Sequence, residues 1–255
     1  MLRFFISAYP KFGRSKKVNA QTVISSPYFW WWYALTENIS YTDRRFLNGP
    51  GEVNEKMRAV FADFGDVSYV GCRYTAFKKW WNEQVSDNET RCQYLFAEPK
   101  VYWQVRIVED SQLANKLLGQ ADQLLVSIPV YMQRTDIENA LDKILKANLK
   151  GEKGRARRDP TQSEARYHLS RHVQIKALQD IFNVYAESKT IKESGVTPNN
   201  LQIARRVGLT YKEKEKADEV SKNSAEMNRA ISNKVSRHLK LARKMIDNAG
   251  MGNFP

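Results

Sequence analysis

The chain has 255 residues, of which 42% are hydrophobic and 11% aromatic. That composition can fill one large core or two smaller ones, and it excludes an intrinsically disordered chain. No apolar run approaches the length of a membrane-spanning helix and the first residues do not read as a signal peptide, so we expect a soluble cytoplasmic protein. Two cysteines, Cys72 and Cys92, are too few for a disulfide framework, and we expect both to be buried.

The formal charge of +13 is unevenly distributed. Residues 150–255 contain 22 Lys and Arg against 12 Asp and Glu, which leaves 19 against 16 in residues 1–149. The two parts therefore carry +10 and +3. Charge concentrated in one part favours a polyanionic partner, DNA first and RNA second. A membrane surface is not favoured, because the basic segment lacks the Trp-, Phe- and Leu-rich face of interfacial helices.

The first hundred residues contain an unusual number of aromatic side chains. Residues 1–12 are typical of an edge strand, and Ser26 with Pro27 predicts the start of a helix over 28–35 that is aromatic on every face. Helical periodicity follows over 53–64 and 74–85. Such helices must be surrounded by protein, so we expect the tryptophans to form a core; stacking platforms for unpaired bases are the alternative. The tryptophans are Trp30, Trp31, Trp32, Trp80, Trp81 and Trp103.

The periodicity changes after residue 94. A strand is predicted over 101–108, a short helix over 112–118, a second strand over 123–130 and a helix over 135–149. We therefore expect residues 1–149 to form an α+β module, rich in aromatic helices, for assembly or for binding a protein partner.

Residues 150–160 are rich in glycine and charge and have no apolar periodicity, which predicts a linker between two modules. Its three arginines, Arg155, Arg157 and Arg158, suit a phosphate-tracking or minor-groove arm as well as a linker.

The remaining residues, 161–255, predict an all-α module with helices over 170–188, 198–207 and 224–248. Ser170 is the expected N-cap of the first helix, Thr197 with Pro198 begins the second, and Gly208 supplies the left-handed turn that ends it. Gly250 is the expected end of the third. Residues 210–223 form either an extra exposed helix or a disordered loop, longer than the turn of a tight helix-turn-helix.

The third helix is two-sided. Apolar residues follow one side, and cations with small polar residues follow the other. Base-edge contacts are expected from Arg229, Asn233 and Ser236, because a recognition helix reads with its N-terminal half. The expected phosphate contacts are Arg205, Arg206, Arg237, Lys240, Arg243 and Lys244.

Residues 197–248 resemble helix-turn-helix DNA-binding regions. The tail over 248–255 and the aromatic block over 26–32 are similar to uncharacterised proteins carried by bacterial mobile elements. These resemblances imply a cytoplasmic bacterial protein that acts in transcription regulation, in transfer or replication, or in anti-phage defence.

Catalytic motifs are scarce. His168 and His172 have metal-clamp spacing, but the cysteines that could complete a zinc site lie far away in the sequence. Glu98 and Lys100, with Asp63, Asp66 and Asp87 upstream, have the residue types of a Mg²⁺-dependent nuclease. No Gly-rich phosphate loop, nucleophile elbow or HExxH motif is present.

The sequence thus predicts a non-enzymatic, cofactor-free DNA-binding protein, a regulator or accessory factor of a bacterial mobile element. A nucleic-acid- or protein-binding subunit of a larger nucleoprotein machine is the alternative, and a metal-dependent nuclease is the third hypothesis. The oligomeric state stays open, with a dimer among the states the sequence allows.

Overall fold

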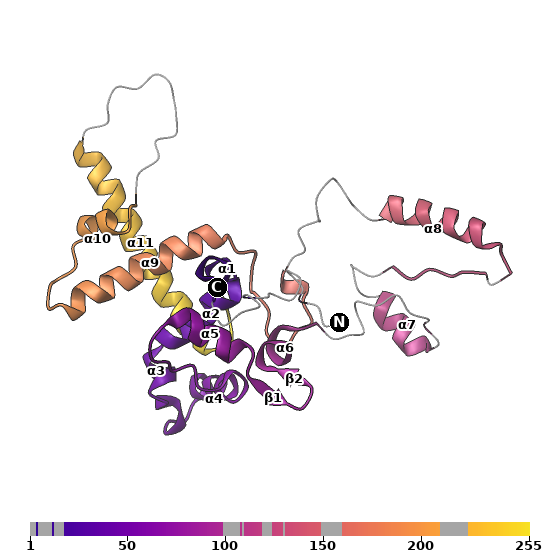
Figure 1. The fold of residues 1–255 in the computed structure, drawn as a ribbon, viewed down its shortest axis with the longest axis horizontal. Helices are drawn as coiled ribbons and strands as arrows, with labels where there is room; N and C mark the ends of the chain where they lie inside the picture. Colours follow the sequence, from indigo (N-terminus) through magenta and orange to yellow (C-terminus); the bar gives the residue numbers. More distant parts are fainter. Residues whose placement is uncertain are drawn as a thin grey trace, which may run out of the picture.

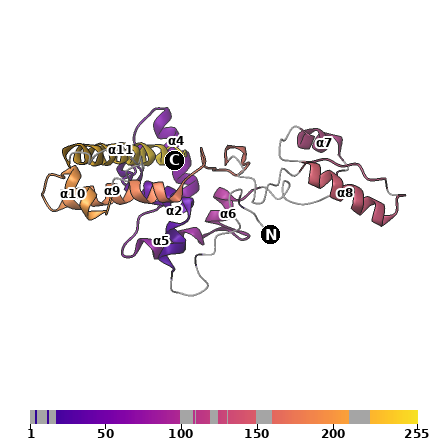
Figure 2. The same ribbon diagram turned by 90° about the horizontal axis from the view of Figure 1, so that it is seen from above.

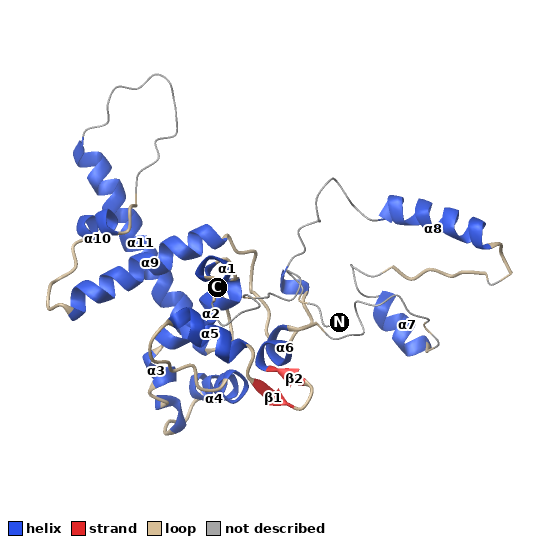
Figure 3. Cartoon of the chain, viewed as in Figure 1, coloured by secondary structure: helices blue, strands red, loops and turns tan. Residues whose placement is uncertain are grey.

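The computed structural model describes Phe4, Phe12 and residues 18–98, 108, 110–118, 124–129, 131–148, 160–209 and 224–255. These residues are mostly helical, with one small antiparallel sheet of two strands (Figures 1 and 3). None of the described helices combines the length and apolar character that crossing a bilayer requires.

Short helices and one hairpin make up the first part of the structure. In chain order they are α1 (Ala20–Ile24), α2 (Pro27–Glu37), α3 (Ile39–Thr42), η1 (Arg45–Leu47), α4 (Glu52–Phe64), α5 (Arg73–Trp81), β1 (Gln84–Ser86), β2 (Glu89–Thr90) and α6 (Arg91–Phe96). After these come α7 (Ser111–Leu118), α8 (Arg134–Asn148), η3 (Pro160–Gln162), α9 (Ile175–Glu193), α10 (Asn200–Arg206) and α11 (Ser224–Gly250).

Helix α2 is the centre of the aromatic core. It begins as predicted, with Ser26 as N-cap and Pro27 in the first turn, and every residue from 28 to 35 is buried. The indole of Trp31 lies 5.6 Å from the ring of Phe96 and 5.7 Å from that of Phe64. The prediction that the tryptophans are core is confirmed for Trp30, Trp31, Trp32, Trp80 and Trp81, while Trp103 lies outside the described residues.

The end of the chain closes this core. Phe254 stacks on Trp31 with 5.6 Å between ring centroids, and the buried residues Ala242 and Ile246 of α11 belong to the same cluster. The side-chain amide of Asn38 donates to the carbonyl of Ile246 at 2.9 Å. Residues on both sides of the predicted linker thus share one core, so the two expected modules are joined by packing as well as by the chain.

A second, smaller cluster holds the three C-terminal helices together. Val184 and Ile191 of α9, Ile203 and Ala204 of α10 and Val235 of α11 are buried against one another. The helices α9, α10 and α11 cross one another on one side of the molecule (Figures 1 and 2). The all-helical character expected for this part is therefore observed.

The strands differ from the prediction. Residues 124–129 form no strand, although a strand was predicted over 123–130. An apolar run becomes a strand only when a neighbouring backbone pairs with it, and Pro129 has no N–H to donate. Of the predicted edge strand over 1–12, Phe4 forms an isolated antiparallel bridge with Ala97. Phe12 is buried but in no strand. The other residues of that segment, and nearly all of the strand expected over 101–108, lie outside the described residues.

The helix predicted over 74–85 ends early. Helix α5 stops at Trp81, and Gln84–Ser86 form the strand β1 that pairs with β2. Helical periodicity through Val85 was a misleading signal, because Val85 is exposed at the hairpin. The helices predicted over 53–64 and 112–118 are confirmed within one residue at each end by α4 and α7. The next predicted helix is present as α8, but it begins at Arg134, so Thr135 and Asp136 lie in its first turn and neither is the expected N-cap.

Ser170 does not cap α9, which begins at Ile175 with Gln174 as N-cap. The backbone before it is used for tertiary hydrogen bonds instead. Tyr167 N–H donates to the carbonyl of Leu95, and Ser170 N–H donates to that of Phe254. Because these donors pair across the core, the segment does not become helical.

Asn199, and not Thr197, is the N-cap of α10, and its side-chain oxygen accepts from Leu201 N–H at 2.8 Å. The end of α10 is as predicted, since Gly208 has φ +66°. Gly250 does not end α11 by a left-handed turn, because it is still helical and Gly252 takes that role with φ +79°. A Cβ on Gly250 would lie 2.7 Å from the amide nitrogen of Asn38, so glycine is needed there for close packing.

Candidate nucleic-acid interface

Helix α11 carries the candidate interface on the side opposite its buried face. Val235, Ala242 and Ile246 are buried, whereas Arg229, Lys240 and Arg243 are exposed. At 3.6 residues per turn, spacings of 11, 14 and 3 place these cations within one narrow sector of the helix. The other exposed residues of this sector and its borders are Ala225, Glu226, Asn233, Ser236, Arg237, Lys244 and Asp247.

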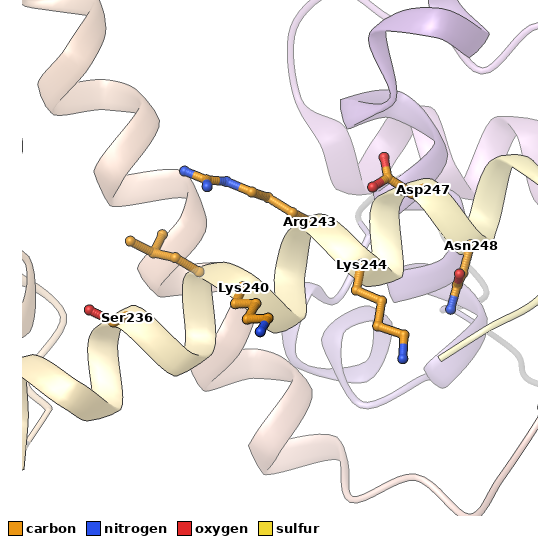
Figure 4. Close-up of a pocket in the computed structure, with 7 residues that line it drawn as sticks. Ser236, Lys240, Arg243, Lys244, Asp247 and Asn248 are labelled. Atoms are coloured by element: carbon orange, nitrogen blue, oxygen red, sulfur yellow. The ribbon is translucent and has the colours of Figure 1, made fainter.

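A groove of about 580 Å³ runs along the C-terminal half of this face. Figure 4 shows Arg243 and Asp247 extending to one side of α11, and Lys240 and Lys244 extending to the other. The groove is therefore bordered by cations on both sides, with one carboxylate, Asp247, near its end. An extended polyanion can contact both borders at the same time.

The exposed cations of α11 have no salt-bridge partner among the residues that the structure describes. In the part of the chain that the structure describes, no salt bridge involves Arg229, Arg237, Lys240, Arg243 or Lys244. Several cations elsewhere do form salt bridges, for example Lys189 with Glu37 and Arg166 with Asp63. Cations without a salt bridge can bind phosphates without first losing an interaction within the protein, so their binding to DNA costs less free energy.

Asn200 sets the position of α10 on α11. Its amide nitrogen lies 3.0 Å from Ser232 Oγ and 2.9 Å from Ser236 Oγ, and 3.2 Å from the carbonyl oxygen of Ser232. This amide has two hydrogens, so the contacts are shared between them. A second hollow of about 490 Å³ lies beside this junction, lined by Pro198, Asn199, Asn200, Leu201, Asn228, Arg229 and Ser232.

Two of the predicted contact residues already have partners. Ser236 accepts the hydrogen bond from Asn200, so its hydroxyl helps to join the helices. Arg206 forms a salt bridge with Glu187 of α9 at 2.9 Å, and its neighbour Arg205 is exposed without a salt bridge among the described residues. Arg155, Arg157 and Arg158 of the predicted linker lie outside the described residues.

His238 lies on the packed side of α11, three residues after Val235 and four before Ala242. It is partly buried, and the buried Nδ1 has no hydrogen-bond partner. Burial lowers the pKa of the imidazole below its ordinary value, and the nearby charges of Lys234 and Arg237 act in the same direction, whereas Asp180 opposes them. The neutral ring is therefore favoured in the fold.

The carboxylates of the nuclease hypothesis are engaged elsewhere. Glu98 is buried, where it accepts hydrogen bonds from the hydroxyl of Ser163 and the N–H of Glu164. Burial raises the pKa of Glu98. Asp63 accepts from the hydroxyls of Tyr94 and Tyr167, each at 2.8 Å, so both carboxylates serve to join segments of the fold.

The remaining residues of that hypothesis add little. Asp66 pairs with Arg44 at 3.1 Å, and Lys100 lies outside the described residues. Among the described residues no three His, Cys, Asp or Glu side chains gather as metal ligands would. Cys92 is buried as predicted, whereas Cys72 is exposed at the start of α5, contrary to the prediction.

Sequence reasoning found the cationic face but missed two residues that shape it. Asn200 was read only as part of a helix, although adjacent asparagines at a helix start are a signal that one caps and the other is available for tertiary contacts. Asp247 lies four residues after Arg243, so helical spacing puts both residues on the same face of α11.

No protein-family model, curated protein or solved structure matches this chain.

Proposed function

We propose that this protein binds duplex DNA through the exposed face of α11 and acts, without catalysis, as a regulator or accessory factor of a bacterial mobile element. The observation that carries the binding proposal is the row of cations, none of them salt-bridged to a described residue, on a helix whose opposite side is buried. The biological setting comes from the sequence resemblance.

The dimensions of α11 suit a DNA groove. From Arg229 to Lys244 the helix rises about 22 Å, at 1.5 Å per residue. The major groove of B-DNA is about 12 Å wide and admits an α-helix. A rigid support is also needed, and the buried side of α11 supplies it by packing against α9, α10, α2 and α4.

Within this face we assign two roles. Arg229 and Asn233 have the long or amide side chains that read base edges, and they lie in the N-terminal half of α11. Ser236 supports them by fixing α10, in addition to any base contact. The phosphate contacts are assigned to Lys240, Arg243 and Lys244, with Arg205, Arg206 and Arg237 beside them.

Salt-dependent binding tests the proposal. The double substitution Lys240→Ala with Arg243→Ala should weaken binding to all duplex sequences by a similar factor. It should also reduce the slope of log K against log salt by about two units, because each phosphate contact contributes about 0.9. Fluorescence anisotropy with labelled duplexes over a salt series gives both quantities.

The matched control removes two other exposed charges, with Arg45→Ala and Lys56→Ala on η1 and α4. This control should leave the salt slope unchanged. Equal slopes for the wild type and the Lys240/Arg243 variant, with both folded, would exclude this face as the contact. Tighter binding to RNA than to duplex DNA would favour the nucleoprotein-machine alternative.

A further inference from the structure

Helices α7 and α8 lie apart from the rest of the described structure in both views (Figures 1 and 2). We call residues 110–148, which contain these two helices, the arm. No described residue of the arm is buried. Nevertheless, nearly half of the large apolar side chains that the structure leaves exposed belong to it, and these are Leu118, Leu124, Leu125, Ile128, Tyr131, Met132 and Leu145.

Helix α8 presents its apolar side chains as a stripe. Ile137, Leu141 and Leu145 recur every four residues, so they lie on one side of the helix. Ile137 and Leu141 are partly exposed, and Leu145 is 41% exposed. Clustered apolar exposure of this kind marks a contact surface more often than a random feature of a protein surface.

The charge of the arm indicates what can cover it. Residues 110–148 carry four cations and five anions, which are Lys116, Arg134, Lys143, Lys146, Asp110, Asp122, Asp136, Glu138 and Asp142. Their formal charge is −1, whereas the other residues of the chain carry +14. Two copies of this basic protein repel each other over most of their surfaces, but not at the arm.

We infer that the apolar stripe of α8 is the contact between two copies of this chain, with the two α8 helices antiparallel. A two-fold contact uses the same surface twice, and a short apolar stripe with nearly neutral surroundings is self-complementary in that sense. The stripe is centred on Leu141, so in this arrangement Leu141 packs against Leu141 of the partner subunit and Ile137 packs against Leu145 of the partner subunit.

Two residues favour the antiparallel orientation. Arg134 lies at the N-terminal end of the stripe, so parallel helices would bring two arginines together, whereas antiparallel helices place each one beside the negative C-terminal end of the other helix. Ala140 is exposed on the border of the stripe next to the two-fold axis, where a small side chain permits close approach. Glu138, on the other border, is neutralised by its salt bridge with Arg134 at 2.8 Å.

The mass of the full-length protein in solution tests the contact. Sedimentation equilibrium after nuclease treatment, at low and at high salt, should give twice the chain mass of 29.6 kDa. Leu141→Glu should raise the dimer dissociation constant about tenfold or more, because it places a carboxylate in the apolar stripe of both copies. Asn139→Glu adds the same side chain on the opposite side of α8 and should leave it unchanged.

A monomer at all concentrations, or a dimer that Leu141→Glu leaves intact, overturns the inference. These outcomes are separate from a failure of DNA binding, since α8 contributes none of the residues assigned to DNA contact. Circular dichroism of both glutamate variants checks that each remains folded.

Disulfide formation tests the orientation. In a Cys72→Ser background, a mixture of the single variants Ile137→Cys and Leu145→Cys should cross-link as the mixed pair. Each variant alone should cross-link little, because antiparallel packing sets residue 137 opposite residue 145. Efficient cross-linking of each variant with itself would show parallel helices, and no cross-linking in any sample would show that α8 is not the contact.

Discussion

The two halves of α11 rest on different supports. Its C-terminal half packs into the aromatic core with α2, where Ala242, Met245, Ile246 and Ala249 are buried. Its N-terminal half packs on α9 and α10 through the small aliphatic cluster, to which it contributes Val235. The C-terminal half of the helix is thus held by aromatic side chains, and its N-terminal half by a few aliphatic side chains.

This difference separates the proposed roles along the helix. The phosphate-contact residues Lys240, Arg243 and Lys244 lie over the aromatic core, where displacement of the helix is costly. The base-edge residues Arg229 and Asn233 lie over the small cluster, where less apolar area is buried and local opening is easier. A fixed charged segment with a more adjustable reading segment suits a protein that first binds backbone and then fits to bases.

The largest effect is expected in the aromatic core. Trp31→Ala should lower the free energy of unfolding by about 3–5 kcal/mol, because it leaves a cavity among Phe64, Phe96 and Phe254. Chemical denaturation followed by far-UV circular dichroism measures it. Trp31→Phe, which retains a ring, is the control and should cost less. A normal unfolding curve together with lost single-strand binding would instead identify a stacking platform.

A smaller and more local effect is expected in the aliphatic cluster. Ile203→Ala should lower stability by about 2–3 kcal/mol, toward the low end for such a change because few side chains surround it. Hydrogen exchange should show lost protection in α10 and in the N-terminal half of α11, with α2 unchanged. Leu201→Ala, at a partly exposed position of the same helix, is the matched control. Equal loss of protection in α2 would show that the two clusters open together.

The smallest effect concerns pH. Because the folded protein holds the pKa of His238 below its ordinary 6.5, the unfolded chain binds the proton more readily. Stability should therefore fall as the pH drops from 6.5 through the lower pKa of the folded state. His238→Gln should make the unfolding free energy depend less on pH, by an amount that corresponds to the uptake of less than one proton on unfolding. The change in unfolding free energy between pH 7 and pH 5 measures this difference. An unchanged pH dependence in the variant would show that the imidazole titrates normally in the fold.

Sequence reasoning reached the candidate interface because that surface is encoded locally. The residue spacing alone shows which side of α11 is apolar and packs against the protein. The cations on the other side are therefore expected to be exposed, whatever the helix packs against. The hydrogen bond between Asn200 and Ser236 and the salt bridge between Arg206 and Glu187 could not be predicted in the same way. Both contacts depend on how α10 crosses its neighbours, which residue spacing within a helix does not contain.

The sequence by itself determined the helices whose signals lie within a few residues. These include the capped aromatic helix α2, the amphipathic helices α4, α8 and α11, and the turn at Gly208, since periodicity and positive φ are local properties.

Tertiary structure decided the features that require a distant partner. The segment before α9 is not helical because Leu95 and Phe254 accept its hydrogen bonds, and residues 124–129 form no strand. Gly250 is needed where Asn38 approaches α11. In each case a backbone group or a side chain meets a partner far away in the sequence, and the free energy of that contact outweighs the local preference.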